Sequence, residues 1–363
     1  MKIFSKLISV IKELSKLTII FLITFLLFFF SREMRISNSN AIVLDEVMVL
    51  FIEDRINLDS LITLMEEHEI EFQEDELRWV SSMLGWRNFT TGRYELEGAY
   101  SYQDFLSKLA LGHQDHAPVT IHPGMSIARL SASLGRQLKA DSSEFAAVFT
   151  DSSSLVMELD YSPESLFSRM LPDTYNIYWT SNPERVIKRI YDEFSRRVTN
   201  RFEDEIAENS LDLEELLTLA SIVEWEARHS HEKPKISGLY MNRLNRGMRL
   251  QADPTVIYAL GEHRRLLFED YQFEHPYNTY LIDGLPPGPI TNPDLNSIAA
   301  AITPEDHDYL YMVANPEGGH VFTRTFEEHR VASAEWRRWI REQFRIRQEL
   351  DRLQELEGGG ETH

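Results

Sequence analysis

The sequence predicts an α+β protein with a single N-terminal membrane-spanning helix, a small βααβ module and a larger mixed α/β domain. Three observations support this prediction. An apolar run follows a basic start, a strand–helix–helix–strand pattern covers about fifty residues, and the rest alternates capped helices with a few short strands. With 363 residues, of which 43% are hydrophobic, the chain can bury one large core or two to three smaller ones.

Charge and cysteine content exclude several classes of function. The formal net charge of −21 repels nucleic-acid phosphates, so we expect no nucleic-acid partner. Because the chain has no cysteine, it has no disulfide, no thiolate nucleophile and no cysteine-ligated zinc.

The first residues indicate a membrane anchor. Residues 1–16 form a basic segment, and an apolar run from Leu17 to Phe30 follows, so we place the transmembrane anchor at 17–32. Fourteen helical residues reach only about 21 Å, which also fits a cleaved signal peptide. Lys16 and Arg32 can extend the span by snorkelling, and no small-x-small cleavage site directly follows the run. The positive-inside rule keeps the basic segment cytoplasmic and exports the chain after about residue 35.

A small module is expected at 45–112. Residues 48–53 and 91–96 have the composition of strands, and 57–70 and 74–84 that of amphipathic helices. An intermediate α/β region at 117–180 follows. It begins with a strand, Val119–His122, turns at Pro123-Gly124 and continues as a helix from Ser126 to Leu138.

The main domain is expected at 181–345. Cap signals and apolar spacing predict its helices, and YLYMV and HVFTR predict a hairpin around ANPEGG. A charged helix begins near 326, and we expect 346–363 to hold its end and a disordered Gly-rich tail. One expected helix starts at Ser181-Asn182-Pro183-Glu184. The others span Asp212–Arg228, Pro234–Arg246, Asp253-Pro254 to Gly261 and Asn292-Pro293 to Ile302, and the hairpin is expected at 309–324.

The helix at 212–228 carries two glutamates with different surroundings. With Leu213 at zero and about 100° per residue, Glu224 falls near 20°, inside the apolar stripe, and Glu226 near 220°, on the face expected to meet solvent. A carboxyl group in an apolar setting has a raised pKa and can serve as a general acid. The alternative is a structural ion pair of Glu224 with Arg243 or Arg249.

Blocks of sequence in a fixed order resemble the endolytic murein transglycosylases, the YceG-like family. The resemblance covers about 160 residues and lies in LPDTY (171–175), LASIVEWEA (219–227), MNRLNRGMRLQADPTVIYALG (241–261), YNTY (277–280), GLPPGPITNP (284–293) and YLYMVANPEGGHVFTRTFEEH (309–329). It implies that 45–112 is a LysM-like module and 181–345 the catalytic domain. One departure is Trp225, where a Lys is usual, and it leaves the contacts near that face less certain.

The resemblance also implies the site residues. Glu224 matches the catalytic glutamate, and the matching blocks supply the expected substrate-binding residues, namely Asn242, Gln251, Asp253, Tyr277, Asn278, Tyr280 and His320. No metal or other cofactor is expected, since no H-E-x-x-H motif occurs and His229 and His231 lie at a helix end.

The expected reaction is internal cleavage of peptidoglycan glycan strands between N-acetylmuramic acid and N-acetylglucosamine, leaving 1,6-anhydromuramoyl ends and limiting glycan length. The expected location is the inner membrane, with the catalytic domain on the periplasmic side. The partners are glycan strands, the cytoplasmic membrane and, as the family suggests, peptidoglycan synthases. Two alternatives stay open: a water-using muramidase with Asp253 as second carboxylate, or a wall-binding scaffold without activity. Asp253 could also be a simple helix cap.

Overall fold

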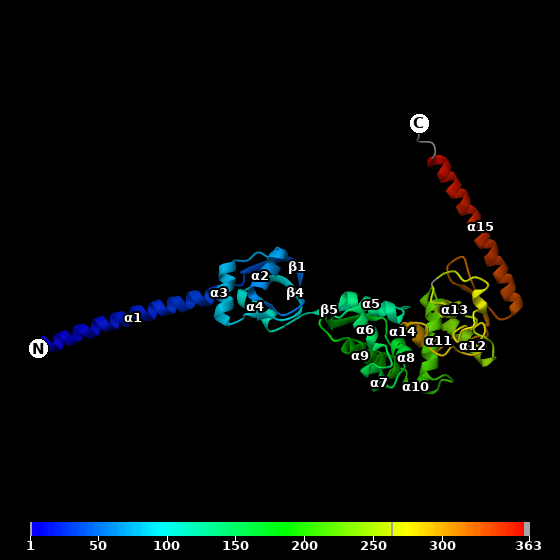
Figure 1. The fold of residues 1–363 in the computed structure, drawn as a ribbon, viewed down its shortest axis with the longest axis horizontal. Coiled ribbons are helices and arrows are strands. Elements are labelled where there is room, and N and C mark those ends of the chain that lie inside the picture. Colours follow the sequence, from blue (N-terminus) through cyan, green and yellow to red (C-terminus); the bar gives the residue numbers. More distant parts are fainter. Residues whose placement is uncertain (1, 263, 359–363) are drawn as a thin grey trace. The chain divides into compact units, whose positions relative to one another are not determined.

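The computed structural model describes residues 2–262 and 264–358, and the chain divides into two compact units (Figure 1). One unit comprises 1–117 with 176–180, and the other comprises 118–175 with 181–363. Because contacts within each unit define it, each is described by itself.

The chain begins with one long helix, α1 (Lys2–Ile36). Its segment Leu14–Ile36, 23 residues long, is long and apolar enough to cross a membrane, and none of its 18-residue core window is buried by the protein. The candidate span is therefore longer than the predicted anchor at 17–32. Its 23 residues exceed the roughly 20 that a helix needs to cross the hydrocarbon core, which the apolar run of fourteen residues did not reach.

The predicted strand–helix–helix–strand order is observed in the first unit. Strand β1 pairs antiparallel with β4 and carries a bulge between Leu44 and Met48. The short strands β2 and β3 form a second ladder, and helix α4 follows β4; the sequence analysis missed all three. The elements are β1 (Ile42–Ile52), β2 (Ile56–Asn57), α2 (Leu58–Glu67), α3 (Glu74–Leu84), β3 (Asn88–Phe89), β4 (Gly92–Tyr100) and α4 (Tyr102–Ala110).

Local signals explain where the helices of this module start and stop. The Asn57 side chain accepts a hydrogen bond from the Ser60 amide and caps α2. Gly85 ends α3 in the left-handed conformation, with φ 75°. The apolar faces of the helices and strands then meet in one core, which includes Leu50, Leu61 and Leu77.

The segment after the module contains more helix than expected. Strands β5 and β6 pair with each other, and the region 141–180, which the sequence left as mixed, holds three short helices. The elements are β5 (His116–Ile121), α5 (Ile127–Gln137), α6 (Ser142–Val148), α7 (Ser154–Leu159), α8 (Pro163–Ser168), β6 (Asp173–Tyr178), α9 (Pro183–Phe194), a π-helical turn (Ser195–Thr199) and α10 (Glu203–Ala207).

Helix α11 (Leu213–Glu226) is the centre of the second unit. It contacts α12, α13 and α14, and its residues 216–223 are all buried, so the core surrounds it. The remaining elements are a 3-10 turn (Ser230–Glu232), α12 (Lys233–Asn245), α13 (Asp253–Leu260), a 3-10 turn (Asp270–Gln272), α14 (Leu295–Ile302), β7 (Tyr311–Ala314), β8 (His320–Thr323) and α15 (Phe326–Gly358).

Most predicted helix ends are confirmed, with two corrections. A capping box between Asp212 and Glu215 starts α11. Asp253 is not a cap: Ala252 takes the N-cap position of α13, and Asp253 is the first helical residue. Helix α14 is capped by Asp294, not by Asn292. The predicted hairpin is β7–β8. The helical end expected from residue 346 continues to Gly358, and residues 359–363 of the expected tail lie outside the described residues.

Candidate active site

Glu224 lies at the junction of three helices. Its Oε2 accepts hydrogen bonds from Lys233 Nζ at 3.1 Å, from the Asp294 amide at 3.0 Å and from Ser297 Oγ at 2.7 Å. Lys233 is the first residue of α12, while Asp294 and Ser297 begin α14. The Glu224 side chain therefore ties the C-terminal end of α11 to the N-terminal ends of its two neighbours.

The charge on Lys233 changes the interpretation of this glutamate. The Lys233 side chain is only 5% exposed and Glu224 11%, and Lys233 Nζ also contacts Asp294 Oδ1 at 2.8 Å. Burial is the largest single influence on the pKa of Asp294 and would raise it, but the hydrogen bonds from Lys233 and the Ser297 amide, together with the charge of Lys233, outweigh burial and lower that pKa. Glu224 is thus in an ion pair, the alternative that the sequence analysis left open, and its partner is Lys233 rather than Arg243 or Arg249.

The two arginines expected as partners serve elsewhere. Arg243 is buried and donates from Nε to the Leu310 carbonyl at 2.7 Å and from Nη1 to the Leu250 carbonyl. Arg249 pairs with Asp283 at 3.0 Å.

Glu226 has the surroundings that the sequence analysis assigned to Glu224. It is half-buried, and its Oε1 accepts a hydrogen bond from the Tyr240 hydroxyl at 2.9 Å. Burial raises the pKa of Glu226 to about 7, and the negative charge of Asp253 adds to this, while Tyr240 and Arg243 act in the opposite direction. The expectation that Glu226 faces solvent is therefore wrong.

The reason is tertiary. Residues 216–223 of α11 are buried on every side, including Ile222 near 180° on the face assigned to solvent. Tyr240 on α12 covers the Glu226 side of the helix. The apolar residues at these angles, Ile222 near 180° and Leu219 near 240°, were the sequence signal that α11 is enclosed.

Asp253 is held by two tyrosines from the loop after α13. Tyr280 donates its hydroxyl to Asp253 Oδ1 at 2.7 Å, and Tyr271 donates to Oδ2 at 3.5 Å. The two rings contact each other with centroids 4.6 Å apart. Burial, followed by the bond to Asp253, raises the pKa of Tyr280, so this hydroxyl keeps its proton. The structure thus places a carboxylate with fixed hydrogen-bond donors close enough to Glu226 to influence its pKa.

Gln251 lies just before this aspartate and is exposed. Its backbone has φ 49°, a left-handed conformation that is uncommon for a residue other than glycine. Its backbone amide donates to the Thr279 carbonyl at 3.1 Å. This bond fixes the segment before Asp253 to the loop that carries Tyr280. Such backbone outliers are typical of functional sites.

Three expected sugar contacts are engaged within the protein. Asn278 is completely buried. Its side-chain Nδ2 donates to the backbone carbonyls of Tyr271 and Phe273, and its Oδ1 accepts from the backbone amide of Tyr280. Asn242 donates to the carbonyls of His307 and Tyr309. The His320 ring nitrogen Nδ1 lies 3.1 Å from Glu232 Oε2, and the His320 backbone amide donates to Glu232 Oε1 at 2.8 Å. These contacts hold His320 against the 3-10 turn before α12.

Tyr277 lines a cavity whose lining does not include Glu226 or Asp253. Its ring contacts Tyr258 with centroids 4.7 Å apart, and the cavity, of about 570 Å³, is also lined by Tyr161, Glu164 and Glu214. Tyr258 ends the same helix, α13, that Asp253 begins. The cavity therefore lies farther along α13 from the two carboxyl groups.

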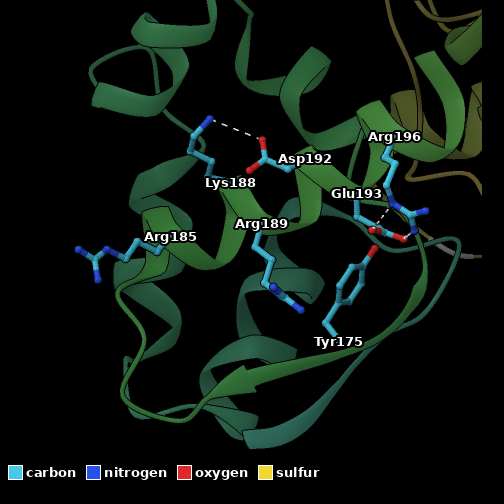
Figure 2. Close-up of a pocket in the computed structure, with 7 residues that line it drawn as sticks. All are labelled: Tyr175, Arg185, Lys188, Arg189, Asp192, Glu193 and Arg196. Carbon is cyan, nitrogen blue, oxygen red and sulfur yellow. Dashed lines mark hydrogen bonds and ion pairs between the residues drawn. The ribbon is translucent and has the colours of Figure 1, made fainter. Parts of the chain in front are cut away.

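A second cavity, of about 470 Å³, lies along α9 and is lined mainly by charged residues (Figure 2). Lys188 contacts Asp192 at 3.6 Å, and Arg196 contacts Glu193 at 2.5 Å. These pairs involve two of its four basic side chains, and none of its lining residues belongs to the Glu226 cluster. We do not assign a role in catalysis to it.

The described part of the chain holds no group of three His, Asp or Glu side chains that could bind a metal ion. The absence of a metal cofactor stays a prediction.

Comparison with known proteins places this chain in a family. Residues 50–335 match the YceG-like family, and the chain therefore belongs to it. An endolytic murein transglycosylase from Bacillus subtilis is 27% identical over 298 residues, covering 77% of this chain and 82% of the relative. An endolytic murein transglycosylase from Streptococcus pneumoniae strain D39 is 29% identical over 278 residues, covering 67% of this chain but 50% of the relative.

A solved structure shares the fold. The 2.6 Å crystal structure of a putative yceG-like protein from Listeria monocytogenes superimposes with a TM-score of 0.54 at 27% identity. It covers 79% of this chain and 99% of that protein.

Proposed function

We propose that this protein is an endolytic murein transglycosylase and that Glu226 is its proton donor. Membership of the YceG-like family and the names of the relatives support the activity. One observation carries the residue assignment. Glu226 has a pKa of about 7, so it holds a proton near neutral pH and can give it to a sugar oxygen.

The reaction needs one such group. Ordinary glycosidases use two carboxyl groups because water or the enzyme supplies the nucleophile. In a transglycosylase the C6 hydroxyl of the muramic acid is the nucleophile. Glu226 protonates the departing glycosidic oxygen as the C1–O bond breaks. The C6 oxygen then bonds to C1, its proton passes to the Glu226 carboxylate, and no water is consumed.

Glu224 is the rival donor, because it matches the glutamate that the family resemblance selects. We assign it a structural role instead. Its Oε2 is shared by three donors, one of them the ammonium group of Lys233. A group in that position fixes the end of α11, which carries Glu226, to the start of α12, the helix that carries Tyr240.

The sugar contacts that we propose lie near Glu226 and along α13. Asp253, Tyr280 and Gln251 would hold the ring at the cleaved bond, since Asp253 and Tyr280 interact electrostatically with the acid and the exposed Gln251 lies two residues before Asp253. Tyr277 would stack on a sugar farther along the strand, in the cavity of about 570 Å³. Asn242, Asn278 and His320 would then act by supporting the loops that their side chains contact.

Product analysis tests the activity. Purified glycan strands should yield internal fragments that end in 1,6-anhydromuramic acid, each lighter by one water than a reducing end. Reducing muramic acid ends would instead show a muramidase, in which Asp253 directs water beside Glu226. Absence of any cleavage, with the protein folded and bound to glycan, would favour the wall-binding scaffold.

The location that we propose follows from the N-terminal helix. Segment Leu14–Ile36 would anchor the chain in the cytoplasmic membrane, with the basic start inside and the rest exported. The module at 45–112 would serve as a LysM-like glycan-binding domain, and 181–345 as the catalytic domain. Protease accessibility in intact and permeabilised cells tests the orientation. Co-purification with peptidoglycan synthases tests the partner that the family suggests.

A further inference from the structure

Helix α15 continues far beyond the fold that supports its start. Its first turns pack on the hairpin, where the rings of Phe326 and His329 lie 6.0 and 5.4 Å from that of Tyr311. From residue 340 onward, every residue whose exposure is described is exposed, and the helix extends away from its own unit (Figure 1). In proteins most helical stability comes from the packing of an apolar face, which this part of α15 does not have within the single chain.

Large, mostly apolar side chains form a stripe, here called the seam, along one face of this part of α15. Large side chains recur at alternating spacings of three and four, the a and d positions of a heptad. Trp336 and Trp339 stack on each other with centroids 4.9 Å apart. The seam positions are Trp336, Trp339, Gln343, Ile346 and Leu350, and the same spacing continues in the sequence at Leu353.

Ile346 is 46% exposed and Leu350 is 54% exposed, and the seam is therefore uncovered in the single chain. The polar residue within the seam, Gln343, is of the kind that fixes the register of a coiled coil. We propose that this face is a dimerisation site, and that a second copy of this chain covers it as a short parallel coiled coil.

Charges beside the seam favour a second copy in parallel orientation. Glu342 occupies a g position and Arg347 the next e position. A parallel pair places Glu342 of one chain opposite Arg347 of the other, twice by symmetry. An antiparallel pair would instead bring g positions together, where Glu335, Glu342 and Glu349 repel one another.

The same charges argue against a membrane surface as the occupant. Helices that lie on anionic membranes are rich in Lys and Arg on their polar face. The helix Phe326–Gly358 has alternating acidic and basic residues, with eight Asp or Glu and seven Arg, so it has no basic excess. Its interface with a second copy is independent of the proposed activity.

The chain offers a clean test because it has no cysteine. In the full-length protein, in detergent with excess empty micelles, Leu350→Cys should form a disulfide-linked dimer under mild oxidation. Arg345→Cys is the matched control, since Arg345 lies off the seam with its side chain 77% exposed. We expect at least fivefold more cross-linked dimer for Leu350→Cys than for Arg345→Cys.

Charge reversal provides a second test that leaves the fold intact. Glu342→Arg should reduce cross-linking at position 350 severalfold, and adding Arg347→Glu should restore it. Equal cross-linking at 345 and 350 would overturn the proposal, as would cross-linking only between mixed Trp336→Cys and Leu350→Cys chains, which indicates an antiparallel pair. A thiol at 350 that stays monomeric and is protected from alkylation by anionic vesicles would assign the face to the membrane and also overturn it.

Discussion

Replacing Glu226 by Gln tests whether the fold holds a proton on this carboxyl group. The folded pKa of about 7 exceeds the ordinary carboxyl value of 4.5. Between these values the unfolded chain ionises while the folded chain keeps its proton, so stability falls as pH rises from about 4.5 to 7. At about 1.36 kcal/mol per pKa unit, the full loss is about 3 kcal/mol. Because Glu226 is only half-buried, solvent screening reduces this to about 1–3 kcal/mol.

Glu226→Gln removes this loss, since an amide stays neutral and still accepts the Tyr240 hydroxyl. Urea unfolding followed by tryptophan fluorescence should show the variant more stable by about 1–3 kcal/mol at pH 8 and by less than about 0.5 kcal/mol at pH 4.5. The exposed Glu208→Gln is the matched control and should show no such pH dependence. Equal stability of variant and wild type at both pH values would refute the assigned protonation state.

Three further substitutions follow from the contacts of the site. Asp253→Asn removes the negative charge that raises the pKa of Glu226, so the alkaline limb of the pH profile of kcat/KM should move to lower pH. Tyr240→Phe removes the bond that lowers this pKa, so the same limb should move to higher pH. For either variant, a shift of the limb in the opposite direction would contradict the role assigned to that residue. Lys233→Met leaves the carboxylates of Glu224 and Asp294 buried without their cation, and calorimetry should show a loss of about 3–5 kcal/mol. An unchanged Tm would contradict the structural role of that ion pair.

Much of the fold could be predicted because its signals are local. The capping box at Asp212 and the left-handed glycines that follow α12 and end α13, Gly247 and Gly261, mark helix ends through interactions within a few residues. The hairpin β7–β8 follows from two strand-like runs around a Gly-rich turn. Helix α4 and the segment 141–180 were missed, since their short elements depend on packing more than on sequence pattern.

The site could be located on α11 but not assigned to the correct surroundings. A helical wheel assumes that one face of a helix is buried and the opposite face is exposed. The central turns of α11 have no exposed face, because residues 216–223 are all buried. The lysine that pairs with Glu224 lies nine residues away, beyond the end of the helix, and the tyrosine that bonds Glu226 lies fourteen away. Neither contact has a signature in the periodicity of α11.

The central claim is that Glu226, and not Glu224, gives the proton to the glycosidic oxygen. Its most direct test is kcat/KM on purified glycan strands for Glu226→Gln and Glu224→Gln, with thermal unfolding confirming that both variants fold. We predict a loss of about 10²–10⁴-fold for Glu226→Gln and a loss below about tenfold for Glu224→Gln. Near-complete loss in Glu224→Gln together with retained cleavage in Glu226→Gln would contradict the account.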